Sequence, residues 1–313
     1  MAGIHHVTAI SGGAHRNLDF YTGTLGMRLV KKTVNFDDPE TYHLYYGDEV
    51  GHPGTILTFF PWEHAAAGRS GVGLTHQTAF RIPAASLGYW THRFIEKNVA
   101  HEVLEKRFGE PVLAFTDPDG MRLALVGVAD IGTETAWSNG DVPAEHAIRG
   151  FHGVTLLLDD MAATGAILSG VLGFANAGTE GAVTRYRADG AGAGAGGVVD
   201  LHEAKGFLRG AMGRGAVHHV AFRARDDAAQ AEMAAQLRDR YGLEPTVQKD
   251  RQYFRSVYFR EPGGILFEIA TDDPGFTVDE PAAALGNSLK LPRLLEPHRK
   301  EIEAALPPLR DAA

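Results

Sequence analysis

The sequence predicts an α+β fold built from four βαβββ modules with curved mixed sheets. Three observations support this prediction: a strand-like segment recurs four times, a helical stretch follows each copy, and segments of alternating hydrophobicity complete it. The copies repeat roughly every 70 residues. The modules lie at about residues 3–62, 73–128, 150–204 and 215–271.

Each module opens with a glycine followed by a short apolar strand that contains histidine. The first copy, Gly3–Ile10, is matched most closely by Gly215–Phe222. Weaker matches begin at Gly73 and Gly150. The same local pattern therefore predicts the same opening β-strand in all four places.

Helical spacing and then strand-like alternation follow each opening segment. The stretch 162–172 has apolar residues at helical intervals, and Gly173 is placed to end that helix. In the last module, residues 255–259 and 265–270 alternate as strands on either side of a turn at 261–264. These signals give one helix and three further strands per module.

A domain boundary and a tail complete the predicted organisation. Residues 130–145 are polar and carry Gly140 and Pro143, as a linker between two-module halves would. We therefore expect domains at 1–135 and 146–275. The segment 276–313 shows apolar residues at helical spacing and is expected to pack on the body as a C-terminal helical tail.

Composition narrows the possible partners. Lysine and arginine number 30 against 39 acidic residues, a formal charge of -9 without a basic cluster, which argues against nucleic acid and anionic membranes. No apolar run reaches about 18 residues and no leader pattern follows Met1, so a cytoplasmic protein with a small-molecule partner is expected. The protein is a monomer or a homo-oligomer, and the sequence leaves both open.

The absence of cysteine leaves histidine and carboxylates as the strong metal ligands.

Differences between the four copies indicate a metal site. A residue needed only for folding should tend to recur, and the first histidine of the opening pair does so, at His5, His76, His152 and His218. The second position varies, being His6, Gln77, Gly153 and His219. Only the first and fourth modules thus carry a second imidazole.

A carboxylate in the last strand completes the predicted ligand set. Glu268 stands in an apolar run, where a charge is costly to bury unless it meets a cation. Counted from the preceding glycine, the equivalent residues in the other modules are Thr58, Ala124 and about Leu201. Only the fourth module supplies this carboxylate.

The three residues are expected to converge in a metal cleft between the curved sheets of modules one and four. Strand side chains alternate between faces, so one histidine of each pair enters a given cleft. His6, His219 and Glu268 then provide two imidazoles and one carboxylate with open coordination positions, a set that favours non-haem Fe(II). A lone pair of adjacent histidines is more often a core or surface feature than a metal site. Its recurrence in modules one and four, together with Glu268, favours the metal site.

The four modules and their ligands resemble the vicinal oxygen chelate superfamily, which includes extradiol dioxygenases, glyoxalases and antibiotic-binding proteins. The resemblance covers nearly the whole chain. Four segments are similar to the hydroquinone-type ring-cleaving dioxygenases: 3–8, 217–219, 250–259 and 291–292.

This resemblance implies an Fe(II)-dependent extradiol-type dioxygenase that cleaves a hydroquinone or catechol-like dihydroxylated aromatic and inserts both atoms of O2. Iron would be bound by His6, His219 and Glu268, with Mn(II) as an alternative and zinc or nickel as adventitious occupants. The resemblance also implies residues near the substrate, namely His5, Thr8, His218, Arg251 and Tyr258. Strand alternation alone would turn His5 and His218 away from the metal.

Two other functions remain as alternatives at the level of the sequence. A glyoxalase-like lyase or isomerase usually uses four ligands, and Thr58 stands where the carboxylate of module one would be. A drug-binding protein of the same fold is commonly a short two-module chain without a metal triad. Chain length and ligand set therefore favour the dioxygenase.

Overall fold

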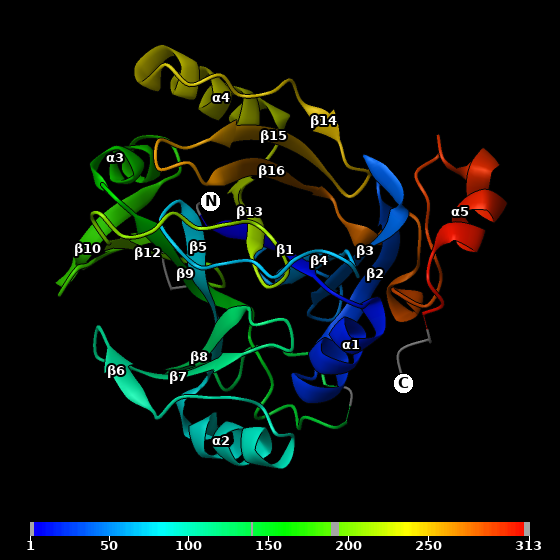
Figure 1. The fold of residues 1–313 in the computed structure, drawn as a ribbon, viewed down its shortest axis with the longest axis horizontal. Coiled ribbons are helices and arrows are strands. Elements are labelled where there is room, and N and C mark those ends of the chain that lie inside the picture. Colours follow the sequence, from blue (N-terminus) through cyan, green and yellow to red (C-terminus); the bar gives the residue numbers. More distant parts are fainter. Residues whose placement is uncertain (1–2, 139, 189–193, 310–313) are drawn as a thin grey trace.

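The computed structural model describes residues 3–138, 140–188 and 194–309 and contains the four predicted βαβββ modules (Figure 1). Module one comprises β1 (Ile4–Ser11), α1 (Ala14–Leu18), the π-helical η1 (Asp19–Thr24), β2 (Arg28–Asn35), β3 (Asp38–Gly47) and β4 (Ile56–Pro61). Module two comprises β5 (Leu74–Pro83), η2 (Ala84–Ser86), α2 (Leu87–Glu96), β6 (Glu105–Arg107), β7 (Glu110–Thr116) and β8 (Arg122–Val128).

The second half of the chain repeats the pattern and adds a tail. Module three comprises β9 (Phe151–Leu158), α3 (Ala162–Gly170), β10 (Phe174–Glu180), β11 (Val183–Ala188) and β12 (Val198–Glu203). Module four comprises β13 (Val217–Ala224), α4 (Asp227–Tyr241), β14 (Lys249–Asp250), β15 (Phe254–Arg260) and β16 (Leu266–Pro274). The tail contains η3 (Phe276–Val278), η4 (Ala282–Ala284), η5 (Glu296–His298) and α5 (Arg299–Ala305).

The strands form two eight-stranded mixed sheets. Modules one and four share the order β14-β15-β16-β13-β1-β4-β3-β2, and modules two and three share β10-β11-β12-β9-β5-β8-β7-β6. In each sheet the two opening strands pair antiparallel at the centre, and each pairs parallel with the last strand of its own module. The boundary expected between residues 135 and 146 therefore does not separate the two sheets.

Helices lie on the outer faces of the sheets (Figure 1). Buried aromatic and aliphatic side chains form a continuous core. Helix α4 lies against the sheet of module four. The Asp226 side chain accepts a hydrogen bond from the backbone N–H of Ala229 at 2.8 Å, and Gly242 ends the helix with φ of 63°. Local capping residues therefore set both ends of this helix.

The tail packs against module one. Leu291, Ile302 and Leu306 are buried in the main core. Lys31 on β2 is fully buried, and its ammonium contacts the carboxylates of Asp279, at 2.6 Å, and of Glu280. Among the residues that the structure describes, no helix is long and apolar enough to cross a membrane.

Strand register corrects one residue equivalence. Glu268 lies opposite Ala221, two residues after His219, whereas Asp200 lies opposite Thr155, two residues after Gly153. The module-three equivalent of Glu268 is therefore Asp200 and not Leu201. The prediction was wrong by one residue because β12 starts one residue after its glycine, whereas β16 starts two residues after Gly264.

Arg185 supplies a positive charge beside Asp200 in the sheet of modules two and three. Arg185 is on β11, opposite Asp200 on β12, and donates two hydrogen bonds to the Asp200 carboxylate, each 2.8 Å long. The same guanidinium donates to Glu110 at 2.5 Å, and His152 lies 3.1 Å from Glu110. Asp200 and Glu110 are thus paired with protein side chains.

Replacing Arg185 by methionine should destabilise the fold, because Asp200 is only 8% exposed and would lose its cation. Removing one partner of a buried ion pair typically costs about 3–5 kcal/mol. The double variant Arg185→Met/Asp200→Leu should recover much of the loss, since that pair is then absent. Urea unfolding measures both effects. A single variant as stable as the wild type would contradict this description.

The same network predicts a pH dependence of stability. Burial raises the pKa of Glu110, but His152 and Arg185 outweigh it and lower the pKa to about 2, from an ordinary 4.5. Because the folded-state pKa lies below the unfolded value, the stability contributed by Glu110 is present above pH 4.5 and lost towards pH 2. The difference in unfolding free energy between wild type and Glu110→Gln should therefore shrink on acidification.

Urea titrations between pH 7 and pH 2.5 or so test this expectation. The exposed Glu63, replaced by glutamine, is the matched control and should show no such pH-dependent difference. A constant difference between wild type and Glu110→Gln over this range would argue against the ionic role of Glu110.

Candidate metal centre

His6, His219 and Glu268 converge on one point, as the comparison of the modules predicts. The two Nε2 atoms lie 3.3 Å apart, and Oε2 of Glu268 lies 3.4 Å from Nε2 of His6 and 3.0 Å from Nε2 of His219. Within the described part of the chain, no other group of three such side chains meets the geometry of a metal site. This arrangement identifies the candidate metal centre.

Strand pairing produces this convergence. His6 on β1 lies opposite Ala221 on β13, and Ala221 lies opposite Glu268 on β16. His219 precedes Ala221 by two residues and therefore shares its face of the sheet. Three adjacent strands thus present the three side chains on one face, and the ligands belong to one continuous sheet of modules one and four.

The electrostatics suit a divalent cation. Burial raises the pKa of Glu268, but the nearby His6 and His219 outweigh it and hold the pKa well below its ordinary range. Burial also lowers the pKa of His219, although Glu268 partly opposes this effect. An ionised carboxylate beside neutral imidazole is the protonation state that metal binding requires.

The hydrogen bonds at Glu268 leave one oxygen for a metal ion. Ser256 donates to Oε1 at 2.5 Å, whereas Oε2 is fully buried and receives no hydrogen bond from any residue that the structure describes. This unsatisfied oxygen faces the two imidazole nitrogens. The donor set therefore fits a divalent metal, which would be bound by His6, His219 and Glu268.

The neighbouring histidines contact the ligand rings edge-on. Nδ1 of His5 lies 2.9 Å from Nδ1 of His6, and Nδ1 of His218 lies 2.8 Å from Nδ1 of His219. Burial lowers the pKa of His5 well below its ordinary value and that of His218 to about 4, so both rings are neutral acceptors. If each ligand donates its Nδ1–H to its neighbour, its Nε2 lone pair is free for the metal.

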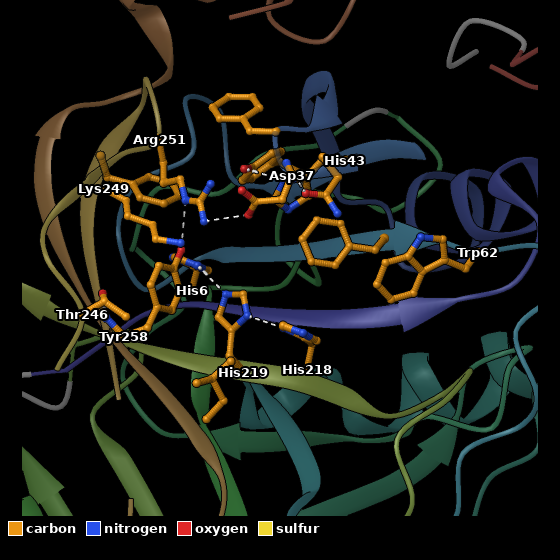
Figure 2. A pocket seen from close by; sticks show the side chains of 16 residues that line it. His6, Asp37, His43, Trp62, His218, His219, Thr246, Lys249, Arg251 and Tyr258 are labelled. Carbon is orange, nitrogen blue, oxygen red and sulfur yellow. Dashed lines mark hydrogen bonds and ion pairs between the residues drawn. The ribbon is translucent and has the colours of Figure 1, made fainter. Parts of the chain in front are cut away.

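A cavity of about 330 Å³ adjoins these ligands, and its size suits a small aromatic molecule. Figure 2 shows His6, His218 and His219 along one side of it, with Arg251 and Asp37 facing each other on another. Its aromatic lining includes Phe36, Tyr45, Phe60, Trp62, Phe254 and Tyr258.

Arg251 and Tyr258 both line this cavity, as the family resemblance implies. Nε of Arg251 donates to the Tyr258 hydroxyl at 3.3 Å, and the same guanidinium pairs with Asp37 at 3.0 Å (Figure 2). Burial, and then the charge of Glu268, raises the pKa of Tyr258 well above its ordinary value. Its hydroxyl therefore stays protonated at neutral pH.

The remaining predicted residues lie in different environments. His218 lines the cavity, whereas His5 and Thr8 are not among its lining residues. Thr8 is fully buried in β1 and accepts a hydrogen bond from the Thr58 hydroxyl at 2.8 Å. The structure thus brings Arg251, Tyr258 and His218 to the cavity and places Thr8 within the sheet.

Sequence reasoning missed several residues of the cavity. His43, Asp37 and Lys249 line it, but none belongs to a recurring motif. Tyr45 could have been found, because it lies opposite Thr58 as Tyr258 lies opposite Glu268. The correspondence between modules, applied to the third strand as well as the first and last, carries that signal.

Comparison with known proteins agrees with this site and fold. Residues 3–125 match the family model described as "Glyoxalase/Bleomycin resistance protein/Dioxygenase superfamily". The protein named "Putative ring-cleaving dioxygenase MhqO" from Bacillus subtilis is 46% identical, over 98% of this chain and 96% of its own. "Chlorohydroquinone/hydroquinone 1,2-dioxygenase" from Sphingobium indicum is 35% identical, over 96% of this chain and 94% of its own.

Solved structures extend the agreement. A crystal structure from B. subtilis, titled as a putative dioxygenase, superposes with a TM-score of 0.93 at 45% identity and covers 99% of this chain and 97% of its own. Glyoxalase I from Zea mays has a TM-score of 0.66 at 16% identity, over 87% and 93% of the two chains, and shares the fold. The chain therefore belongs to the glyoxalase/bleomycin resistance protein/dioxygenase superfamily, within its group of ring-cleaving dioxygenases.

Proposed function

We propose that this enzyme is an Fe(II)-dependent, extradiol-type dioxygenase that opens the ring of a hydroquinone or catechol-like diphenol and inserts both atoms of O2. One observation carries the proposal: His6, His219 and Glu268 converge beside a cavity lined by aromatic side chains. Fe(II) in this site would supply open positions for a phenolate and O2 and a route for electrons between them. Mn(II) is the alternative metal, and zinc or nickel would bind adventitiously.

The aromatic walls would orient the substrate ring. Phe60 and Trp62 are stacked with 5.6 Å between their centroids, and Phe60 also meets His218 edge-on at 5.8 Å. A flat diphenol packs against such aromatic side chains better than an aliphatic substrate of equal volume. Holding the ring in one orientation beside the metal ligands reduces the entropy cost of the reaction.

Tyr258 and His218 both offer hydrogen-bond donors to the cavity. The Tyr258 oxygen accepts from Arg251, and its own O–H would be the donor to a substrate oxygen in the cavity. If His218 accepts through Nδ1 from His219, its single remaining hydrogen is on Nε2 and can also be donated. These donors, with the positive charge of Arg251, would stabilise negative charge on a substrate oxygen and supply a proton to it.

A glyoxalase-like reaction is less well supported. The fourth ligand of such a site would come from the position of Thr58, whose Oγ1 is hydrogen-bonded to Thr8 at 2.8 Å and to His43 at 2.8 Å. A threonine hydroxyl in a closed hydrogen-bond chain is a poor substitute for a carboxylate ligand. This observation favours the three-ligand dioxygenase.

We propose a small diphenol and O2 as the partners of the enzyme, and neither nucleic acid nor a membrane. The formal charge of -9 supports this choice. A cytoplasmic location is also proposed, since a chain without cysteine needs no oxidising compartment.

Oxygen uptake tests the reaction class. Protein loaded anaerobically with Fe(II) should consume O2 with hydroquinone or catechol and should leave the methylglyoxal–glutathione adduct unchanged. His219→Ala should lose both iron and turnover, because only two ligands remain. His76→Ala is the control, since His76 opens module two in the other sheet and contacts Ser70 and His202. Full activity of His219→Ala would rule out this site.

Tyr258→Phe should retain iron but lower kcat by about 100-fold, because a donor to developing negative charge is removed. Iron content and steady-state oxygen uptake measure the two effects separately. Tyr46→Phe is the matched control: Tyr46 is buried on β3 and donates to Asn17, outside the cavity. An unchanged kcat in Tyr258→Phe would remove Tyr258 from the reaction.

A further inference from the structure

The cavity contains a second tyrosine that is related to Tyr258 by the correspondence between modules one and four. Tyr45 on β3 lies opposite Thr58 on β4, just as Tyr258 on β15 lies opposite Glu268 on β16. Both tyrosines line the cavity. Module one therefore places a phenol hydroxyl in the cavity, but the residue opposite it is Thr58 and not a carboxylate.

A chain of hydrogen bonds runs from the Tyr45 hydroxyl into the sheet. The hydroxyl lies 2.9 Å from Nδ1 of His43, and Nε2 of His43 lies 2.8 Å from Oγ1 of Thr58. Thr58 in turn donates to Oγ1 of Thr8 at 2.8 Å. Thr8 and Thr58 are fully buried and Tyr45 is 2% exposed, so water cannot readily replace these bonds.

The direction of the hydrogen bonds in this chain is fixed from its buried end. Thr58 has one hydroxyl hydrogen and gives it to Thr8, so its oxygen must accept from Nε2–H of His43. Burial, and then the nearby His219, lowers the pKa of His43 well below its ordinary value, so the ring carries only this one hydrogen. Nδ1 must therefore accept the hydroxyl hydrogen of Tyr45.

This polarity makes Tyr45 an acceptor towards the cavity. Its only hydrogen is donated to His43, and its oxygen retains a lone pair for another partner. Tyr258 lies across the strand row β15-β16-β13-β1-β4-β3 from Tyr45 and offers a donor, as does the Arg251 guanidinium that is bonded to it. The cavity thus has a donor side, which suits an ionised phenolate, and an acceptor side, which suits a neutral hydroxyl.

We propose that Tyr45, oriented by His43, binds the ring hydroxyl of the substrate that is not held at the metal centre, and so selects a 1,4-diphenol over a 1,2-diphenol. The proposal rests on the proposed function. In a 1,4-diphenol the second hydroxyl projects across the ring from the first, whereas in a catechol both hydroxyls lie on the same side. Only the 1,4 arrangement can reach the donor and acceptor sides together.

The packing of Tyr45 allows its hydroxyl to be tested alone. Its ring contacts Phe276, with 5.1 Å between centroids, and Tyr253, at 6.1 Å. Phenylalanine preserves these contacts, so Tyr45→Phe removes the acceptor without opening a void. A loss of activity in this variant would therefore not arise from a lost core side chain.

Binding to zinc-loaded protein separates this inference from the reaction itself, because zinc does not undergo redox chemistry. The probes are hydroquinone, 4-methoxyphenol and catechol, measured by calorimetry. Hydroquinone and 4-methoxyphenol differ at the distal oxygen, where only hydroquinone has a hydrogen to donate. Wild-type protein should bind hydroquinone about tenfold more tightly than 4-methoxyphenol, as expected for one buried hydrogen bond.

Tyr45→Phe should remove most of this preference while catechol affinity changes less than about twofold. Thr58→Val should also reduce the preference for hydroquinone over 4-methoxyphenol. In this variant His43 loses the acceptor of its Nε2–H and can donate to Tyr45 instead. With Fe(II)-loaded protein, Tyr45→Phe should raise KM for hydroquinone with little change in kcat, the pattern of a uniform binding contact.

Two results would overturn the proposal: equal affinity of wild-type protein for hydroquinone and 4-methoxyphenol, or an equal loss for hydroquinone and catechol in Tyr45→Phe. The second result would indicate a purely structural tyrosine. Absence of oxygen uptake by iron-loaded wild type would instead count against the proposed function and leave the calorimetric comparison valid.

Discussion

The antiparallel pairing of β1 with β13 is the contact on which the rest of the site depends. It brings together His6 and His219, which are 213 residues apart in the chain, and it fixes which face of the sheet each presents. A shift of one residue in this pairing would turn either histidine to the opposite face. The parallel pairing of β13 with β16 then brings Glu268 into the same row. Backbone hydrogen bonds across three strands therefore determine the positions of the ligand atoms.

The two sheets satisfy the same electrostatic requirement in different ways. Each has a carboxylate at the corresponding position of a final strand, Glu268 in one and Asp200 in the other. In the second sheet the guanidinium of Arg185 neutralises that charge from the strand position that Tyr258 occupies in the first. Because the tyrosine at that position carries no charge, Oε2 of Glu268 is left beside the two imidazoles and can be used by a metal ion. The residue type on the third strand, together with Gln77 and Gly153 in place of the two imidazoles, thus distinguishes the second sheet from the candidate metal centre.

The sequence was sufficient for the modules and the three converging ligands, because both depend on patterns that recur at known intervals. It was insufficient where strand register matters: counting from the preceding glycine gives Leu201 as the equivalent of Glu268, whereas the structure identifies Asp200. It also could not reveal that the chain of bonds from Tyr45 through His43 ends at Thr8, since these residues meet only after three strands pair. Local periodicity specifies strands and faces, whereas partners across strands are set by tertiary packing.

The sharing of one sheet by the first and last modules has a consequence for biosynthesis. During translation β1 leaves the ribosome early, but its central partner β13 and the ligand Glu268 follow only near the end of the chain. A nascent polypeptide therefore holds His6 on a strand with an unpaired edge, which is a potential site of aggregation. The three side chains of the candidate metal centre can meet only when nearly all of the protein has been made, so a translation product truncated before Glu268 cannot form the complete centre.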